Sequence, residues 1–173
     1  MRIVFIRYSH SVERLEWKGS DDTRPLSKRG LIRAERFAER LKKIYERPDE
    51  IVSSIYLRAR QTAMIISSTF NMKKISGNPL LNPGMDFSSF KVFLSSIPAD
   101  TKLLFIVAHG VEMSVVIKEL IMNYDIEIYF KKPSLIELDV DISSMTGKIV
   151  FSNAYDEPFT GENFKRENDM NLV

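Results

Sequence analysis

The ten residues MRIVFIRYSH, residues 1–10, decide the fold that we expect for this chain. Residues 3–6 form an apolar run without alternation, which is typical of a strand buried on both faces of a parallel sheet. The run stops abruptly at Arg7, and His10 follows three residues later. In open α/β sheets the ligand crevice lies beyond the carboxyl ends of the strands. Arg7 is therefore either a ligand-binding residue or an arginine that extends from a strand end into solvent.

The same arrangement occurs twice more. Residues 50–54 predict a short strand followed by a helix with Arg58 in its first turn, and residues 102–108 predict a buried strand followed at once by His109. Right-handed crossovers would bring all three junctions to one edge of the sheet. The first turn of a helix favours an anion, so the recurrence predicts an anion pocket. The alternatives are an exposed helix arginine at Arg58 and a structural, hydrogen-bonded imidazole at His109.

The rest of the pattern alternates helices with strands. We expect four helices. The first is capped by Ser27 and ends before Pro48, the second covers residues 56–70, the third lies around residues 87–94 and the fourth covers residues 111–122. A short strand is predicted at residues 73–76, and residues 134–140 with residues 148–151 predict a hairpin at the sheet edge. This is an α/β chain with one domain, residues 1–152, and a polar tail, residues 153–173.

The amino-acid composition excludes or disfavours several classes of function. The 173 residues contain 25 Lys and Arg against 23 Asp and Glu, a net charge of +2, which gives no reason to expect nucleic acid or a membrane as a partner. The chain has no cysteine, which excludes thiol catalysis, disulfides and thiolate metal sites, and only two histidines, which disfavours a histidine-rich metal site. No signal-peptide or membrane-spanning pattern is found, so we expect a cytoplasmic protein.

An imidazole beside two guanidinium groups suits phosphoryl chemistry. The arginines would hold the equatorial phosphoryl oxygens, and the ring of His109 would stabilise charge or move a proton. A second histidine could act as the nucleophile that takes up the phosphoryl group.

Five motifs in order along the chain resemble the histidine phosphatase superfamily, also called phosphoglycerate mutase-like. They are FIR (residues 5–7), RPLSKRG (residues 24–30), VSSIYLRARQTA (residues 52–63), LNPGMD (residues 81–86) and IVAHG (residues 106–110). Within the superfamily, the short SixA-type phosphohistidine phosphatase branch is the nearer likeness, because the chain has no room for an inserted substrate cap.

The resemblance implies a three-layer α/β/α fold with a mostly parallel sheet and a phosphate pocket at the strand ends. The pocket would hold Arg7, Arg58 and His109, with Arg24 reaching in, and it would need no metal or cofactor. The reaction would be hydrolysis of a phosphomonoester or phosphoramidate through a phosphohistidine intermediate. The partner would be a phosphorylated protein or a small phosphomonoester.

One departure leaves two hypotheses open. The superfamily motif is Arg-His-Gly, whereas this chain has Tyr8 and Ser9 after Arg7, and a phenol is a poor nucleophile at neutral pH. His10 could enter the pocket instead, although its Cα would be displaced by about 6 to 7 Å. Either the protein is a phosphatase with His10 as a relocated nucleophile, or it is a weak or inactive relative that still binds phosphate or phosphorylated protein. Asp86 is a conceivable proton donor.

Overall fold

The computed structural model describes residues 1–154, and its elements follow one another in the alternating order expected from the sequence. They are β1 (Arg2–Arg7), η1 (Asp21–Thr23), α1 (Lys28–Ile44), β2 (Glu50–Ser53), α2 (Leu57–Thr69), β3 (Ser76–Gly77), η2 (Pro79–Leu81), α3 (Phe87–Ser95), β4 (Leu103–Ala108), α4 (Gly110–Ile121), β5 (Ser134–Asp141) and β6 (Thr146–Ala154).

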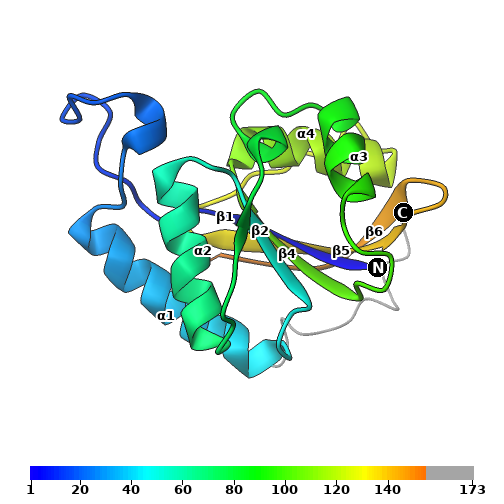
Figure 1. Ribbon diagram of the computed structural model, residues 1–173. Helices are drawn as coiled ribbons and strands as arrows, with labels where there is room; N and C mark the ends of the chain where they lie inside the picture. The colour runs from blue at the N-terminus through cyan, green and yellow to red at the C-terminus, as the bar shows by residue number, and fades with distance from the viewer. Residues whose placement is uncertain (155–173) are drawn as a thin grey trace.

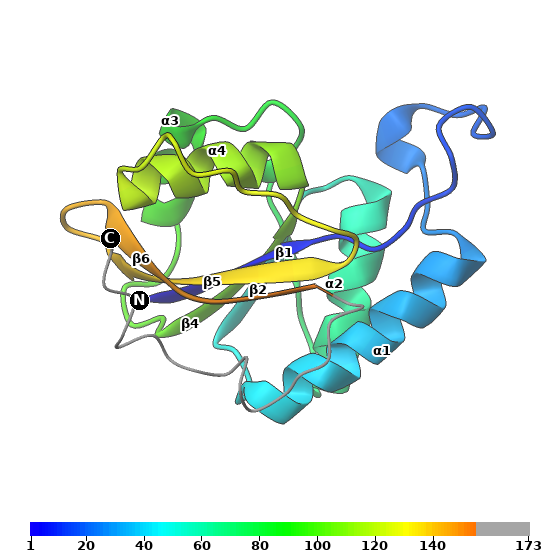
Figure 2. The same cartoon turned by 180° about the vertical axis from the view of Figure 1, so that it is seen from behind.

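These strands form one sheet in the order β3-β2-β4-β1-β5-β6. The first four strands of the chain pair in parallel, so β1, β2 and β4 all end at the same edge. β5 runs antiparallel to β1, with Ser134 opposite Arg7, and β6 continues as an antiparallel hairpin at the sheet edge. Because β5 starts where β1 ends, the connection from α4 to β5 also arrives at this edge (Figure 2).

Helices cover both faces of the sheet, which gives the three expected layers (Figure 1). Alternate residues of β1 separate the two cores. Ile3 and Phe5 pack with α3 and α4, whereas Val4, Ile6 and Tyr8 pack with α1 and α2. β4 is buried along its whole length, as the unbroken apolar run predicted.

α1 begins as its sequence predicts. The Ser27 side chain accepts a hydrogen bond from the Gly30 amide, which satisfies one of the free N–H groups of the first turn. Its buried side includes Ala34, Phe37 and Leu41. Gly30 packs directly against the backbone of His10. A Cβ at residue 30 would lie 1.8 Å from the His10 carbonyl oxygen, so only glycine fits this close approach.

Two of the predicted strand boundaries differ from the structure. The short strand expected at residues 73–76 is found at Ser76–Gly77, and β6 extends to Ala154, two residues into the segment predicted as a tail. The rest of that predicted tail, residues 155–173, lies outside the described residues. Within residues 1–154, no helix is long and apolar enough to cross a membrane.

Candidate functional site

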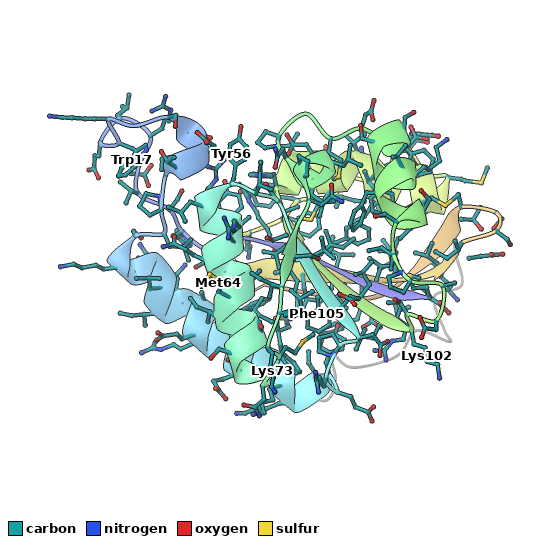
Figure 3. All side chains as sticks on the ribbon, in the orientation of Figure 1. Trp17, Tyr56, Met64, Lys73, Lys102 and Phe105 are labelled. Carbon is teal, nitrogen blue, oxygen red and sulfur yellow. The ribbon has the colours of Figure 1, made fainter. Side chains whose placement is uncertain are left out.

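The residues singled out in the sequence meet at the carboxyl edge of the parallel strands. Arg7 ends β1, His109 directly follows β4, and Arg58 lies in the first turn of α2 after β2. Arg58 is 3% exposed, so it is not the exposed helix arginine of the alternative interpretation, and His109 is 5% exposed. The connection of residues 11–26, which carries η1 and Trp17, lies beside this edge next to Tyr56 (Figure 3).

Two of the arginines converge on one carboxylate, that of Asp21 in η1. Arg58 Nη2 lies 2.9 Å from Asp21 Oδ2, and Arg58 Nη1 donates to the Asp21 carbonyl oxygen at 2.7 Å. Arg24 Nε donates to Asp21 Oδ1 at 2.8 Å. Partial burial raises the pKa of Asp21, but the hydrogen bond from Arg24 and the charge of Arg58 outweigh it, so the net pKa is lowered. The site therefore holds an oxyanion of its own between two guanidinium groups.

Arg7 is held by the segment that leads into β5. Its Nη1 donates to the Phe130 carbonyl oxygen. Gly110 leaves the space for this packing, because a Cβ there would lie 3.0 Å from Arg7 Cδ and 3.1 Å from Phe130 Cβ. The glycine after His109 is thus explained by close packing around Arg7. The Nε atoms of Arg7 and Arg58 are buried and have no hydrogen-bond partner within the described residues.

Tyr8 is 6% exposed and lies among cations. Arg58 Cζ lies 4.9 Å and Lys132 Nζ 5.1 Å from the centre of its ring, which is cation–π distance. The His109 ring meets it edge-on at 5.3 Å. Burial raises the pKa of Tyr8, but Lys132, Arg58 and Arg7 together lower it below its ordinary value.

His109 is a neutral imidazole with a defined tautomer. Ser54 Oγ donates to Asn82 Oδ1 at 2.9 Å, so its contact of 3.0 Å with His109 Nε2 requires a proton on that nitrogen. Nδ1 is then the acceptor of the ring. Burial and, next, the charge of Arg58 lower the pKa of His109 to about 3. At neutral pH this ring can accept a proton but carries no positive charge.

His10 lies on the α1 side of the site. Its Nε2 is 3.5 Å from Arg33 Nη1, and its Nδ1 is buried with no hydrogen-bond partner within residues 1–154. Partial burial and then the charges of Arg33, Arg29, Lys132 and Arg7 lower its pKa, so this imidazole is neutral at pH 7.

Asp86, the conceivable proton donor, lies at the start of α3. It is the N-cap of α3, where its carboxylate accepts a hydrogen bond from the Ser89 amide at 2.7 Å. That hydrogen bond lowers its pKa, so the carboxylate is ionised at neutral pH.

Sequence reasoning missed three participants: Asp21, Ser54 as a partner of His109, and Lys132. Asp21 lies in a long connection without periodicity. For Lys132 a signal existed. A strand that pairs antiparallel with β1 must begin where β1 ends, and Lys132 lies two residues before that beginning.

Comparison with known proteins adds a family likeness to this geometry. Residues 3–82 match the model of the histidine phosphatase superfamily (branch 1). The matched part contains Arg7, Tyr8, Arg24 and Arg58, whereas His109 lies beyond it. A comparison with curated protein sequences finds no match.

Solved structures share the fold over nearly the whole chain. The protein histidine phosphatase SixA complexed with tungstate has a TM-score of 0.79 at 18% identity, covering 90% of this chain and 97% of that one. A mycobacterial glucosyl-3-phosphoglycerate phosphatase complexed with VO3 has a TM-score of 0.70 at 17% identity, covering 88% and 99%. The alpha-ribazole phosphatase of Shigella flexneri has a TM-score of 0.70 at 15% identity, covering 90% and 97%.

The fold is therefore the phosphoglycerate mutase-like α/β fold of the SixA structures, as the sequence predicted. The three phosphatases are named for three different substrates, so the fold does not select one.

Proposed function

We propose that this protein is a phosphatase of the histidine phosphatase type, which hydrolyses phosphohistidine in a protein or a small phosphomonoester. The observation that carries the proposal is the convergence of Arg24 and Arg58 on the Asp21 carboxylate at the strand ends. Two guanidinium groups that share one carboxylate can share the oxygens of a phosphoryl group in the same way. The ligand would replace Asp21, and the buried Nε groups of Arg7 and Arg58 would add donors.

Hydrolysis would need no metal or cofactor in this proposal, because the arginines stabilise the charge of the transferring group. The nucleophile in this proposal is His10, the histidine that follows two residues after Tyr8, where the superfamily motif has its own histidine. Its neutral imidazole would attack phosphorus, forming an N–P bond while the P–O or P–N bond to the leaving group breaks. Water would then release phosphate and restore His10. In the first step the His10 ring would lose its N–H proton, which His109, with Nδ1 as an acceptor, would pass to the leaving group; in the second step water would supply hydroxide to phosphorus and a proton to the departing His10 ring.

The test is to identify the phosphorylated residue. The parent protein is incubated with a small phosphodonor such as phosphoramidate, and turnover is measured together with mass spectrometry of the quenched protein. We expect acid-labile phosphate on His10, and turnover lost in both His10→Ala and His109→Ala. Acid-stable phosphate on Tyr8 would contradict the role of His10 and make Tyr8 the nucleophile.

A second candidate function is binding of phosphate or phosphorylated protein without turnover. It is favoured by Tyr8, whose buried ring contacts Arg58, His109 and Lys132 at the position of the family nucleophile. In that case phosphate binding, measured by calorimetry, would be lost in Arg58→Ala, while no phosphodonor would be hydrolysed or label the protein.

A further inference from the structure

The connection from α4 to β5 brings a lysine to the site from a direction that the family motifs do not include. Ser134, the first residue of β5, pairs with Arg7, the last residue of β1. The segment just before Ser134 therefore crosses the carboxyl edge of the parallel strands (Figure 2). The hydrogen bond from Arg7 to the Phe130 carbonyl oxygen fixes this segment against the site. Lys132 lies between these two anchored residues.

Two neighbouring lysines in this segment have different surroundings. Lys131 is exposed and lines a separate cavity of about 240 Å³ along β5 and β6. Lys132 is half-buried, and its ammonium group lies 5.1 Å from the centre of the Tyr8 ring. Lys132 forms no ion pair with another described residue: the salt bridges of the described part of the chain involve other cations.

The charge of Lys132 acts on three titratable rings of the site. It lowers the pKa of Tyr8, whose ring centre lies 5.1 Å from the ammonium group, and it also lowers the pKa of His10 and of His109. A half-buried ammonium without a carboxylate partner is costly unless an anion binds beside it. The site already holds the guanidinium groups of Arg7, Arg24 and Arg58, so the missing partner is best supplied by an anionic ligand in the same place.

We propose that Lys132 is a further ligand of the phosphoryl group, and that its ammonium group donates to a phosphoryl oxygen beside the Tyr8 ring. This inference rests on the proposed function and adds a residue that binds the substrate directly. On binding, the ammonium exchanges its contact with the Tyr8 ring for a charge-assisted hydrogen bond to phosphate. Lys132 would then make the site favour a doubly charged phosphomonoester over a singly charged phosphodiester.

The experiment measures the affinity of inorganic phosphate and of orthovanadate by isothermal calorimetry on the full chain. Lys132→Met is compared with the parent, with Lys131→Met as the matched control and with Arg58→Ala as the reference for loss of the site. We expect Lys132→Met to weaken both anions by roughly tenfold to a hundredfold, the value of one charge-assisted hydrogen bond. Lys131→Met should bind as the parent does, and Lys132→Arg should restore most of the affinity.

Equal losses in Lys132→Met and Lys131→Met would overturn the inference, because they would show only a general effect of surface charge. Unchanged affinity in Lys132→Met with loss in Arg58→Ala would also overturn it while leaving the proposed function intact. A parent protein that binds neither anion would contradict both. As a separate readout, the ultraviolet titration of Tyr8 should move to higher pH in Lys132→Gln, and an unmoved titration would show that the ammonium is not beside the ring.

Discussion

Replacing His109 with Gln should make the stability of the protein less dependent on pH. The folded-state pKa of His109 is about 3, against about 6.5 for an unfolded histidine. The unfolded chain therefore binds an extra proton between these values, and the stabilising effect of the neutral ring is present above pH 6.5 and is lost as the pH falls below it. Between pH 7 and pH 5 this one group removes about 2 kcal/mol from the free energy of unfolding.

The assay is urea unfolding of the parent and of His109→Gln at both pH values. An amide keeps a neutral polar group beside Ser54 but does not titrate. His10, whose lowered pKa acts in the same direction, is present in both proteins and cancels in the comparison. We expect the parent to lose about 2 kcal/mol more than the variant, a difference of about 1 M in the midpoint for a slope of about 2 kcal/mol/M. Equal losses would refute the buried, neutral His109.

Three further perturbations test the neighbouring parts of the site. Elsewhere in a helix, Gly→Ala would raise the free energy of unfolding by about 1 kcal/mol. Gly30→Ala should instead lower it by about 2–4 kcal/mol in urea unfolding, because the added Cβ would lie 1.8 Å from the His10 carbonyl oxygen. An unchanged midpoint would exclude that close approach. Asp21→Asn should strengthen phosphate binding several-fold in calorimetry, since the carboxylate competes for Arg24 and Arg58; weaker binding would make Asp21 a positioning residue instead. Tyr8→His should raise the hydrolysis of p-nitrophenyl phosphate above the parent, and a folded variant that neither hydrolyses it nor becomes phosphorylated at residue 8 would contradict a preserved family pocket.

The fold could be predicted because its signals are local. The unbroken apolar runs of β1 and β4 identify doubly buried strands, the Ser27 cap marks the start of α1, and the alternation in β5 identifies the edge hairpin. The strand-end positions of Arg7, Arg58 and His109 then follow from the handedness of the crossovers. The end of β6 could not be predicted, because Asn153 and Ala154 extend the strand through pairing with β5, which sequence periodicity does not record.

The site was harder to predict than the fold because its decisive contacts join residues distant in sequence. Asp21 meets Arg58 across 37 positions, and Lys132 meets Tyr8 only because β5 pairs antiparallel with β1. These contacts also bear on the role of residue 8. A histidine in place of Tyr8 would place a smaller imidazole among the same cations. The larger tyrosine ring fills the space and contacts Arg58 and Lys132 through its face. In the proposed phosphatase, the nucleophile is therefore either Tyr8 or a group that reaches the phosphoryl group past Tyr8, and the position of the covalent phosphate distinguishes the two.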